Sequence, residues 1–355
     1  MKIIQIMPEF GLAGAETMCE NLTYELNKLG HDVLIISMYN YHSEITERME
    51  KKRIKILYLG KMPGWDFSMI DKMKKIFIQE KPDVIHTHRY VMQYAIPAAI
   101  GAKIKRRIHT VHSVAKQENI FLARKVNLIF YKFANVTPVA LSKNVQKTIA
   151  KEYGLNEAQI PIIFNGINLQ NCKPKTSYVW QDTINIVHVG RFVKAKNHTA
   201  LIESFANITE LYPNCRLHLI GDGAEKNKIE ILVKQKRLQN KVLFWGLQNN
   251  VFSFLHNADI FVLPSTYEGM PMTLIEAMGT GLPIVASDVG GVSDMVRNEK
   301  TALLIKPNVE GITNALKLLI NDLALREKIG ENALVASKKF SAYNMARKYV
   351  NLYLE

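Results

Sequence analysis

Short apolar runs alternate with longer segments of helical spacing along the first half of the chain. The apolar runs have the length of buried strands. They lie at 3–6, 33–36, 84–86, 107–110, 136–140 and 160–164. The helical segments lie at 15–29, 68–79, 91–99, 120–133 and 142–153. Because strands alternate with helices, the pattern predicts a parallel sheet covered by helices.

The same alternation begins again after a polar, aperiodic stretch near 166–182, which we interpret as a linker. Strand-like runs of the second half lie at 184–189, 216–220, 242–244, 260–263 and 284–286. The last segment, 333–354, has helical spacing. A chain of 355 residues is long enough for about two domains. We therefore predict an α/β protein with domains at 1–167 and 168–339.

Residues 259–291, ADIFVLPSTYEGMPMTLIEAMGTGLPIVASDVGG, show this organisation most clearly. A strand ends at Pro264, a loop follows, and Pro271 opens a helix, because its missing N–H would be unpaired in a first turn. Ligands of parallel sheets bind beyond the carboxyl ends of strands, where a helix start favours phosphate. Glu276, in the helix, can then bind vicinal hydroxyls, while Glu268 faces what lies beyond the phosphates. The alternative is that Glu268 is a solvated loop residue and Glu276 caps a neighbouring turn.

A second signal is the loop G-R-F-V-K-A-K-N that follows the strand at 184–189. Arg191 offers a fork of donors and Lys196 a point charge, so the two can clamp a diphosphate. Two cations in a loop are more often only solvated. We favour the diphosphate clamp here because the same chain also carries the segment with Glu268 and Glu276. Lys194 is interpreted as a bystander.

Glycines and histidines mark the strand ends of the first half. The turn G-L-A-G-A-E lacks the full G-x-G-x-x-G spacing, and no acidic residue closes the second strand, which argues against a dehydrogenase. His86 and His88 end one strand, and His109 and His112 end another. A metal site is conceivable, but no nearby carboxylate completes it. We expect His86 and His109 to be buried and hydrogen-bonded.

Taken in order, these motifs resemble retaining glycosyltransferases of family 4, which have the GT-B fold of two Rossmann-like domains facing each other across a cleft. E-G-M-P-M-T-L-I-E is similar to the E-x7-E motif of the family, and G-R-x-x-x-x-K-N to its diphosphate loop. G-L-A-G-A-E resembles its G-G-x-E loop, with Leu12 and Ala13 loosening the glycine pair. G-D-G, F-W-G and N-G-I-N resemble further family turns. Asn168 stands where the family usually has an acidic residue, and Asp294 stands where many members have Glu.

The resemblance implies a set of site residues. Those implied in catalysis are Arg191, Lys196, Glu268 and His112. Those implied in donor binding are Gly14, Glu276, Gly221, Gly246, Leu247, Met270, Pro271, Met272 and Thr273. Those implied on the acceptor side are Glu16, His88 and Asn165. The resemblance also implies that a helix at about 340–355 crosses back onto the first domain. No D-x-D motif is present, so we expect neither a metal nor a cofactor.

The charge is uneven: residues 1–175 hold 26 Lys and Arg against 15 Asp and Glu, and the rest hold 20 against 17. A basic half suggests an anionic partner. A nucleic-acid partner is not expected, because no recognition motif is present. The cluster Lys103, Lys105, Arg106 and Arg107 and the segment 120–133 together suggest an anionic membrane surface. The alternative is that 120–133 is an ordinary core helix with a solvated edge.

Three scattered cysteines and the absence of a signal peptide or spanning segment indicate a cytoplasmic protein, with peripheral attachment to the inner face of the plasma membrane left open. The resemblance implies a metal-independent hexosyltransferase of the exopolysaccharide and capsule type. It would move a sugar from a nucleotide-diphosphate sugar, UDP- rather than GDP-, to a glycan or lipid-linked saccharide. The alternatives are a GT-B epimerase or phosphorylase and a catalytically silent partner of a transferase complex.

Overall fold

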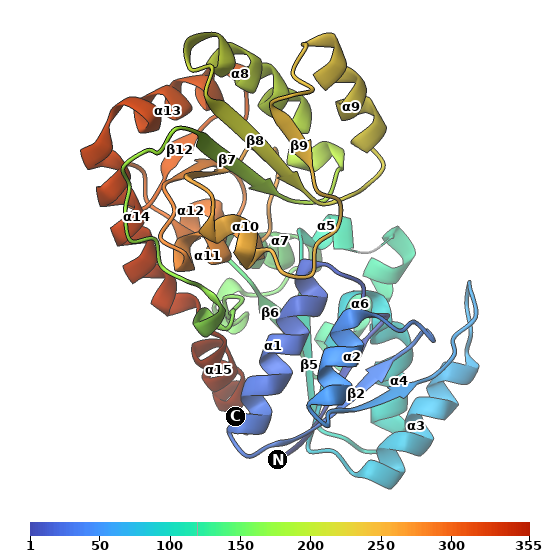
Figure 1. The fold of residues 1–355 in the computed structure, drawn as a ribbon. Helices are drawn as coiled ribbons and strands as arrows, with labels where there is room; N and C mark the ends of the chain where they lie inside the picture. The colour runs from blue at the N-terminus through green and yellow to red at the C-terminus, as the bar shows by residue number, and fades with distance from the viewer. Residues whose placement is uncertain (119) are drawn as a thin grey trace. The chain divides into compact units, whose positions relative to one another are not determined.

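The computed structural model describes residues 1–118 and 120–355, which form two compact units with one six-stranded sheet each (Figure 1). Unit 1 comprises Met1–Gly166 and Ala342–Glu355, and unit 2 comprises Ile167–Ser341. None of the helices in the described residues combines the length and the apolar character that crossing a bilayer requires. Two parallel sheets flanked by helices confirm the predicted α/β class.

The sheet of unit 1 is parallel and has the strand order β3-β2-β1-β4-β5-β6. Its strands are β1 (Lys2–Met7), β2 (Asp32–Ser37), β3 (Lys55–Tyr58), β4 (Val84–His88), β5 (Arg106–Val111) and β6 (Val136–Ala140). Its helices are α1 (Gly14–Lys28), α2 (Glu44–Lys51), α3 (Ser68–Glu80), α4 (Met92–Gly101), α5 (Ala115–Glu118), α6 (Phe121–Phe133), α7 (Lys143–Tyr153) and α15 (Ala342–Leu354). Strand β1 is central, with Ile3 paired to Val33 on one side and to Val84 on the other.

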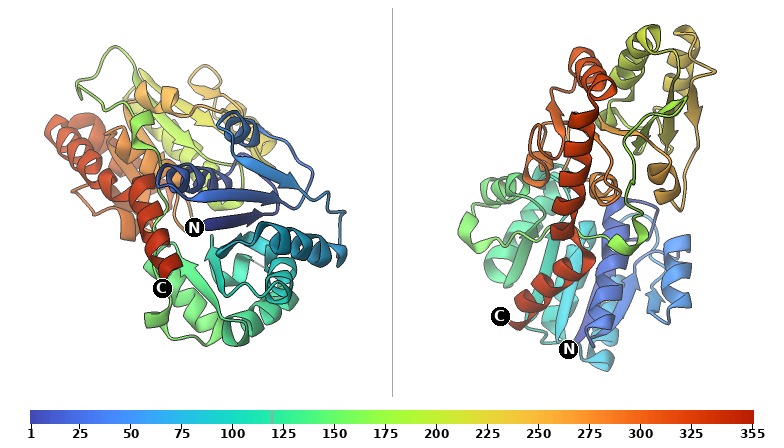
Figure 2. Two further views of the ribbon diagram at one scale, coloured as in Figure 1. Left: turned by 90° about the horizontal axis from the view of Figure 1, so that it is seen from below. Right: turned by 60° about the vertical axis from the view of Figure 1, so that its left-hand side comes forward.

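Helices cover both faces of this sheet. α4 packs against α3 and α6, while α1 packs against α2 and α15 (Figures 1 and 2). One core lies beneath α3 and α4, where Phe77 and Tyr94 meet apolar side chains of β1, β2 and β4. The strands are continuous apolar runs because both of their faces are buried in this way.

The C-terminal helix α15 is part of unit 1, although it follows unit 2 in the sequence. The Tyr353 hydroxyl lies 2.7 Å from Nδ1 of His86, and the Tyr349 hydroxyl lies 2.7 Å from Oγ1 of Thr110. Nε2 of His86 lies 2.8 Å from the same Thr110 oxygen. Because these four side chains are buried, α15 completes the hydrogen bonding of β4 and β5.

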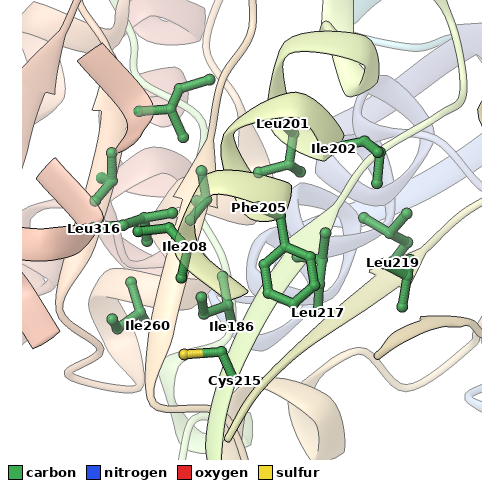
Figure 3. Packing of buried hydrophobic residues seen from close by; sticks show 14 of the residues in the cluster. Ile186, Leu201, Ile202, Phe205, Ile208, Cys215, Leu217, Leu219, Ile260 and Leu316 are labelled. Carbon is green, nitrogen blue, oxygen red and sulfur yellow. The ribbon is translucent and has the colours of Figure 1, made fainter. Parts of the chain in front are cut away.

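The sheet of unit 2 is also parallel, with the order β12-β11-β10-β7-β8-β9. Its strands are β7 (Ile184–Val189), β8 (Cys215–Ile220), β9 (Val242–Phe244), β10 (Ile260–Leu263), β11 (Ile284–Ser287) and β12 (Leu303–Ile305). Its helices are α8 (His198–Leu211), α9 (Lys226–Gln235), α10 (Phe252–His256), α11 (Met272–Gly279), α12 (Val292–Met295), α13 (Val309–Asn321) and α14 (Leu323–Ser337). Phe205 of α8 packs among Ile186, Leu217 and Ile260 of the strands in the core (Figure 3).

The structure differs from the predicted elements in several places. Residues 160–164 form no strand: only Ile162 makes an isolated bridge, to Ala140, and Pro161 has no N–H with which to continue a ladder. The short edge strands β3 and β12 were missed, because neither is a long, fully buried apolar run. The predicted final helix at 333–354 is two helices, α14 and α15, separated by a bridge between Ile167 and Ser341.

Candidate functional site

The strand order of unit 2 reverses between β7 and β10, which are neighbours in the sheet. From β7 the chain proceeds outward through β8 to β9, and from β10 it proceeds in the other direction through β11 to β12. In open α/β sheets, ligands bind beyond the carboxyl ends of the strands at such a switch point. The two loops that flank it are 190–197, after β7, and 264–271, after β10.

The first loop carries the two predicted cations in different surroundings. Arg191 is exposed, and its guanidinium makes no hydrogen bond or ion pair with any residue that the structure describes. Lys196 closes a 3₁₀ turn and is half-buried. Asn197 follows with φ 55°, a left-handed conformation that Asn tolerates. Its amide donates to the Pro264 carbonyl at 3.1 Å and fixes loop 190–197 to loop 264–271.

The second loop supplies the partner of Lys196. Lys196 Nζ donates to Oε1 of Glu268 at 2.6 Å, and the Ser265 hydroxyl donates to the same oxygen at 2.6 Å. Glu268 is buried, so the loop residue expected to face the ligand is held in a charge-assisted pair. The Thr266 N–H also donates to the Ala195 carbonyl at 2.8 Å, so the two loops form one unit.

Glycines allow neighbouring loops to approach these two closely. Gly290 has φ +57°, and a Cβ there would lie 1.8 Å from the Glu268 carbonyl oxygen. Gly221 has φ +135°, and a Cβ there would lie 2.1 Å from the Gly190 carbonyl oxygen. The predicted donor-binding residue Gly221 therefore packs the loop after β8 onto the loop of Arg191. The glycine pair after β11 does the same for the loop of Glu268.

Helix α11 begins at the switch point, as the sequence predicts. Pro271 is its N-cap residue, and in the described part of the chain no side chain caps its first turn. Met270, Pro271 and Met272 are buried, while Thr273 is half-buried. The helix start therefore offers backbone N–H groups near Thr273 within an apolar frame, which suits an anion.

Glu276 lies in the second turn of α11 and is buried. Burial raises the pKa of its carboxyl group to about 7. A carboxylate in an apolar setting gains most from a ligand that donates hydrogen bonds to it. This supports, on chemical grounds, the expectation that Glu276 binds hydroxyl groups.

The carboxyl end of β9 carries an aromatic pair that the sequence analysis did not single out. Trp245 stacks on His218 with ring planes 6° apart, and its Nε1 donates to Nδ1 of His218 at 3.1 Å. Gly246, with φ +66°, and exposed Leu247 follow directly. The signal that could have found this pair is a tryptophan at a predicted strand end, because an exposed indole offers a stacking surface.

The strand order of unit 1 reverses between β1 and β4, so it has a switch point of its own. Gly14 opens α1 after β1, is exposed, and does not have a positive φ. Glu16 is buried and pairs with Arg89, which directly follows β4 at φ 57°. Sequence reasoning missed Arg89, because an arginine after a strand carries no signal without its partner.

The histidines of unit 1 form a hydrogen-bonded row. Nδ1 of His88 lies 3.1 Å from Nε2 of His112, and Nε2 of His88 lies 3.2 Å from the Gln5 amide oxygen. His112 is half-buried, and burial is the main cause that lowers its pKa to about 3, so its ring is neutral near pH 7. His88 is fully buried behind it and can act on a ligand only through His112. His86 and His109 are buried and hydrogen-bonded, which confirms the prediction for them.

The remaining predicted residue, Asn165, is buried at the end of unit 1, next to the boundary at Gly166. Within residues 1–118 and 120–355, no group of three or more His, Cys, Asp or Glu side chains is arranged to hold a metal ion. The chemistry available at the switch point of unit 2 is thus that of an anion site. It combines the exposed Arg191, the paired Lys196, an uncapped helix start and a carboxyl group suited to hydroxyl donors.

Two family models match the chain, and together they span most of it. Residues 12–171 match the family described as Glycosyltransferase Family 4, and residues 176–335 match the one described as Glycosyl transferases group 1. The first match lies mainly in unit 1 and the second in unit 2.

Curated relatives and solved structures agree with these matches. The chain is 28% identical to the UDP-Gal:alpha-D-GlcNAc-diphosphoundecaprenol alpha-1,3-galactosyltransferase of Escherichia coli, over 82% of this chain and 80% of that one. It is 26% identical to the N-acetyl-alpha-D-glucosaminyl L-malate synthase of Bacillus anthracis, over 82% and 80%. Anabaena HepE, solved with UDP and glucose, superposes with a TM-score of 0.86 at 19% identity, over 99% of this chain and 98% of that one.

Proposed function

Because this chain belongs to the family 4 glycosyltransferases, we propose that it moves a sugar from a UDP-sugar to a lipid-linked saccharide, with retention of anomeric configuration, in the synthesis of a cell-surface polysaccharide of the exopolysaccharide or capsule type. The observation that carries this proposal is the switch point of unit 2. Arg191, Lys196 and the start of α11 gather there, and Glu276 lies one turn further along the helix.

The diphosphate leaving group gains negative charge as the bond to the sugar breaks. Arg191, Lys196 and the N–H groups near Thr273 stabilise this charge, and of these Lys196 and the N–H groups are held in place before the donor binds. The Glu268 pair and the Asn197 bridge between the loops supply that order for Lys196. These groups take the part that a divalent ion plays in metal-dependent transferases.

The remaining groups fix the two ends of the donor. Glu276 accepts hydrogen bonds from the ribose hydroxyls, while the backbone at Gly221 and Gly246 and the side chain of Leu247 border the base. Met270, Pro271 and Met272 frame the phosphates. The family resemblance assigns the sugar end to Glu268 and His112, and it assigns to Gly14 the close approach of the backbone to the donor phosphates.

No covalent intermediate on the protein is needed. The acceptor hydroxyl attacks the anomeric carbon from the face that the diphosphate leaves, the bond from carbon to the diphosphate oxygen breaks, and a leaving phosphate oxygen takes the acceptor proton. On the acceptor side we assign Glu16, His88 and Asn165. Glu16 would act while paired to Arg89, and His88 through His112.

The names of the relatives support the substrate classes to different degrees. The Escherichia coli relative is named for UDP-galactose and a diphosphoundecaprenol-linked acceptor, and Anabaena HepE was solved with UDP and glucose. The Bacillus anthracis relative is named for L-malate, so the acceptor class varies among relatives of similar identity. We favour the lipid-linked acceptor because unit 1 carries the basic excess. The buried free cysteines and this acceptor support a cytoplasmic protein at the inner face of the membrane.

The test is incubation with a panel of UDP- and GDP-sugars, with and without undecaprenyl-diphosphate saccharides. Thermal shift and nucleotide release report on the donor, and NMR of the new anomeric proton reports on stereochemistry. Release that depends on acceptor, with a retained configuration, is expected. Interconversion of sugar nucleotides without acceptor would identify an epimerase instead. Absence of a thermal shift with every nucleotide would identify a silent partner.

A further inference from the structure

Helix α6 of unit 1 has one exposed face. Its exposed residues are Phe121, Leu122, Lys125, Ile129, Lys132 and Phe133, which we call the α6 face. At 100° per residue they fall within an arc of about 120° around the helix axis. Ala123, Asn127 and Tyr131 lie on the other side and are buried. The helix is therefore neither a buried core helix nor an ordinary surface helix with a polar exterior.

The composition of the α6 face is the reverse of what a solvated helix presents. Its four apolar side chains are between 54% and 82% exposed, although a surface helix normally turns such residues inward. Its only charged residues are Lys125 and Lys132. Arg124 does not belong to it, since its guanidinium lies 3.0 Å from Glu152 and is mostly buried. A contiguous exposed apolar face of this kind marks an interaction surface.

A second exposed apolar segment lies between β3 and α3. Met62, Trp65 and Phe67 are each more than half exposed, and the Trp65 and Phe67 rings stack with centroids 6.0 Å apart. Lys61 is buried beneath them and donates to the carbonyl oxygens of Met62, at 2.8 Å, and Gly64. The segment is thus held in shape by a buried lysine and presents its apolar side chains outward.

The two segments share an edge and a helix layer of unit 1. The first follows the carboxyl end of β3 and leads into α3, and the α6 face begins soon after the carboxyl end of β5. Carboxyl ends of parallel strands meet at one edge, and α4 packs against both α3 and α6. His112, assigned above to the sugar end of the donor, directly follows β5 at this same edge. The apolar segments and the proposed chemistry thus lie at one end of unit 1.

The opposite edge of the sheet of unit 1 also carries exposed basic residues. Helix α6 returns toward the amino ends of the strands, where Lys103 and Lys105 are exposed before β5. Arg106 and Arg107 are only partly exposed, so these two contribute less to the surface than their place in the sequence suggests.

We propose that the α6 face docks on the anionic surface of a lipid bilayer. Phe121, Leu122, Ile129 and Phe133 would sink among the acyl chains, and Lys125 and Lys132 would remain at the level of the headgroups. A second copy of the chain fits this face poorly, because a two-fold contact would bring lysines together with no acidic residue on the face to pair them. A nucleic acid fits it poorly as well, since four large apolar side chains have no place on a phosphate backbone. The proposal rests on the proposed function in one respect: docking would bring the protein to its lipid-linked acceptor.

The test is co-sedimentation with vesicles of phosphatidylcholine alone or with 30 mol% phosphatidylglycerol, over a series of salt concentrations. The first variant, Leu122→Gln/Ile129→Gln/Phe133→Gln, removes apolar groups, and its control, Ile231→Gln/Val335→Gln, changes equally exposed apolar residues of unit 2. The second, Lys125→Gln/Lys132→Gln, removes charge, and its control is Lys234→Gln/Lys236→Gln on unit 2. All substituted side chains are exposed, so folding should not be affected.

The wild type should bind anionic vesicles, and binding should weaken as salt rises. Each α6 variant should lower the partition coefficient about tenfold or more, while its control stays near the wild type. Equal binding by the α6 variants and their controls would overturn the proposal. A wild-type dimer without lipid that the apolar variant dissociates would assign the face to a second copy instead. The thermal shift given by UDP should be unchanged in both α6 variants, and its absence in the wild type would count against the proposed function but not against docking.

Discussion

Lys196 and Glu268 are 72 residues apart in the sequence, and they form an ion pair with Nζ 2.6 Å from Oε1 across the switch point of unit 2. Lys196 is therefore already paired in the absence of a phosphate ligand. Its charge is positioned by a buried carboxylate that the Ser265 hydroxyl also holds. A diphosphate that binds here has to share the ammonium group with Glu268, so the pair links stability to function.

The first prediction concerns this pair. Lys196→Ala leaves the buried Glu268 carboxylate with the Ser265 hydroxyl and should lower the free energy of unfolding by about 1–3 kcal/mol. Adding Glu268→Gln removes the unpaired charge, so the double variant should be less destabilised than the sum of the single ones. Urea unfolding of the four proteins measures this coupling. Additive losses would mean that the pair contributes nothing.

The second prediction is that Arg191 contributes to activity but not to stability. The Arg191 side chain is exposed and makes no hydrogen bond or ion pair with the described residues. Arg191→Ala should therefore leave the free energy of unfolding within about 0.5 kcal/mol of the wild type. The same change should cost roughly 2–4 kcal/mol of transition-state stabilisation, measured from kcat/KM. Lys194→Ala, an exposed cation of the same loop, is the control and should retain activity. Near wild-type turnover in Arg191→Ala would remove Arg191 from the site.

The third prediction follows from the pKa of Glu276. Between its ordinary value of 4.5 and the folded value of about 7, the folded protein keeps a proton that the unfolded chain has released. The unfolding free energy should therefore fall as pH rises through this window. Glu276→Gln does not titrate, so at pH 8 it should be more stable than the wild type, by about 3 kcal/mol at most, and this gain should vanish toward pH 5.

Thermal unfolding between pH 5 and 8 measures the effect of Glu276→Gln. The matched control is Glu331→Gln, an exposed position on α14 where the stability difference should be flat with pH. The Glu276 variant should also lose the thermal shift given by UDP, because an amide is a weaker acceptor for ribose hydroxyls than a carboxylate. A gain in stability with an unchanged nucleotide response would contradict the ribose role.

The fourth prediction is that turnover persists in EDTA. Arg191, Lys196 and the start of α11 supply the positive charge that a metal would supply to the leaving diphosphate. Activity measured before and after chelation, and again after adding Mg²⁺ or Mn²⁺, is the check. Loss in EDTA with rescue by either ion would contradict the roles assigned to the two cations.

Most strands could be predicted from the sequence, because a parallel strand buried on both faces is a continuous apolar run. The loops of Arg191 and Glu268 could be placed at strand ends for the same reason. The contact between these loops could not be predicted, because it depends on β7 and β10 being neighbours in the sheet. The spacing of apolar residues does not determine the order of strands. The short edge strands β3 and β12 were missed because their runs are short and incompletely buried.

Helix α6 shows a different limit of the sequence. Its spacing predicted a helix, but the pattern did not decide which of its apolar residues are covered by the rest of unit 1. The same holds for Gly290, whose need for glycine is set by a carbonyl oxygen 22 residues earlier in the chain, at Glu268. In both cases the deciding neighbour is distant in sequence, and only the folded chain identifies it.

The place of α15 also has a consequence for the order in which the protein can be assembled during synthesis. Domains commonly fold as they emerge, the N-terminal one first. Here the buried His86 and Thr110 side chains form hydrogen bonds with Tyr353 and Tyr349, which follow unit 2 in the chain. All of unit 2 is synthesised in the meantime. Unit 1 thus begins to fold first but is completed only after unit 2 has been made, and a chain truncated before α15 would leave the ribosome with unit 1 incomplete and recognisable to proteases.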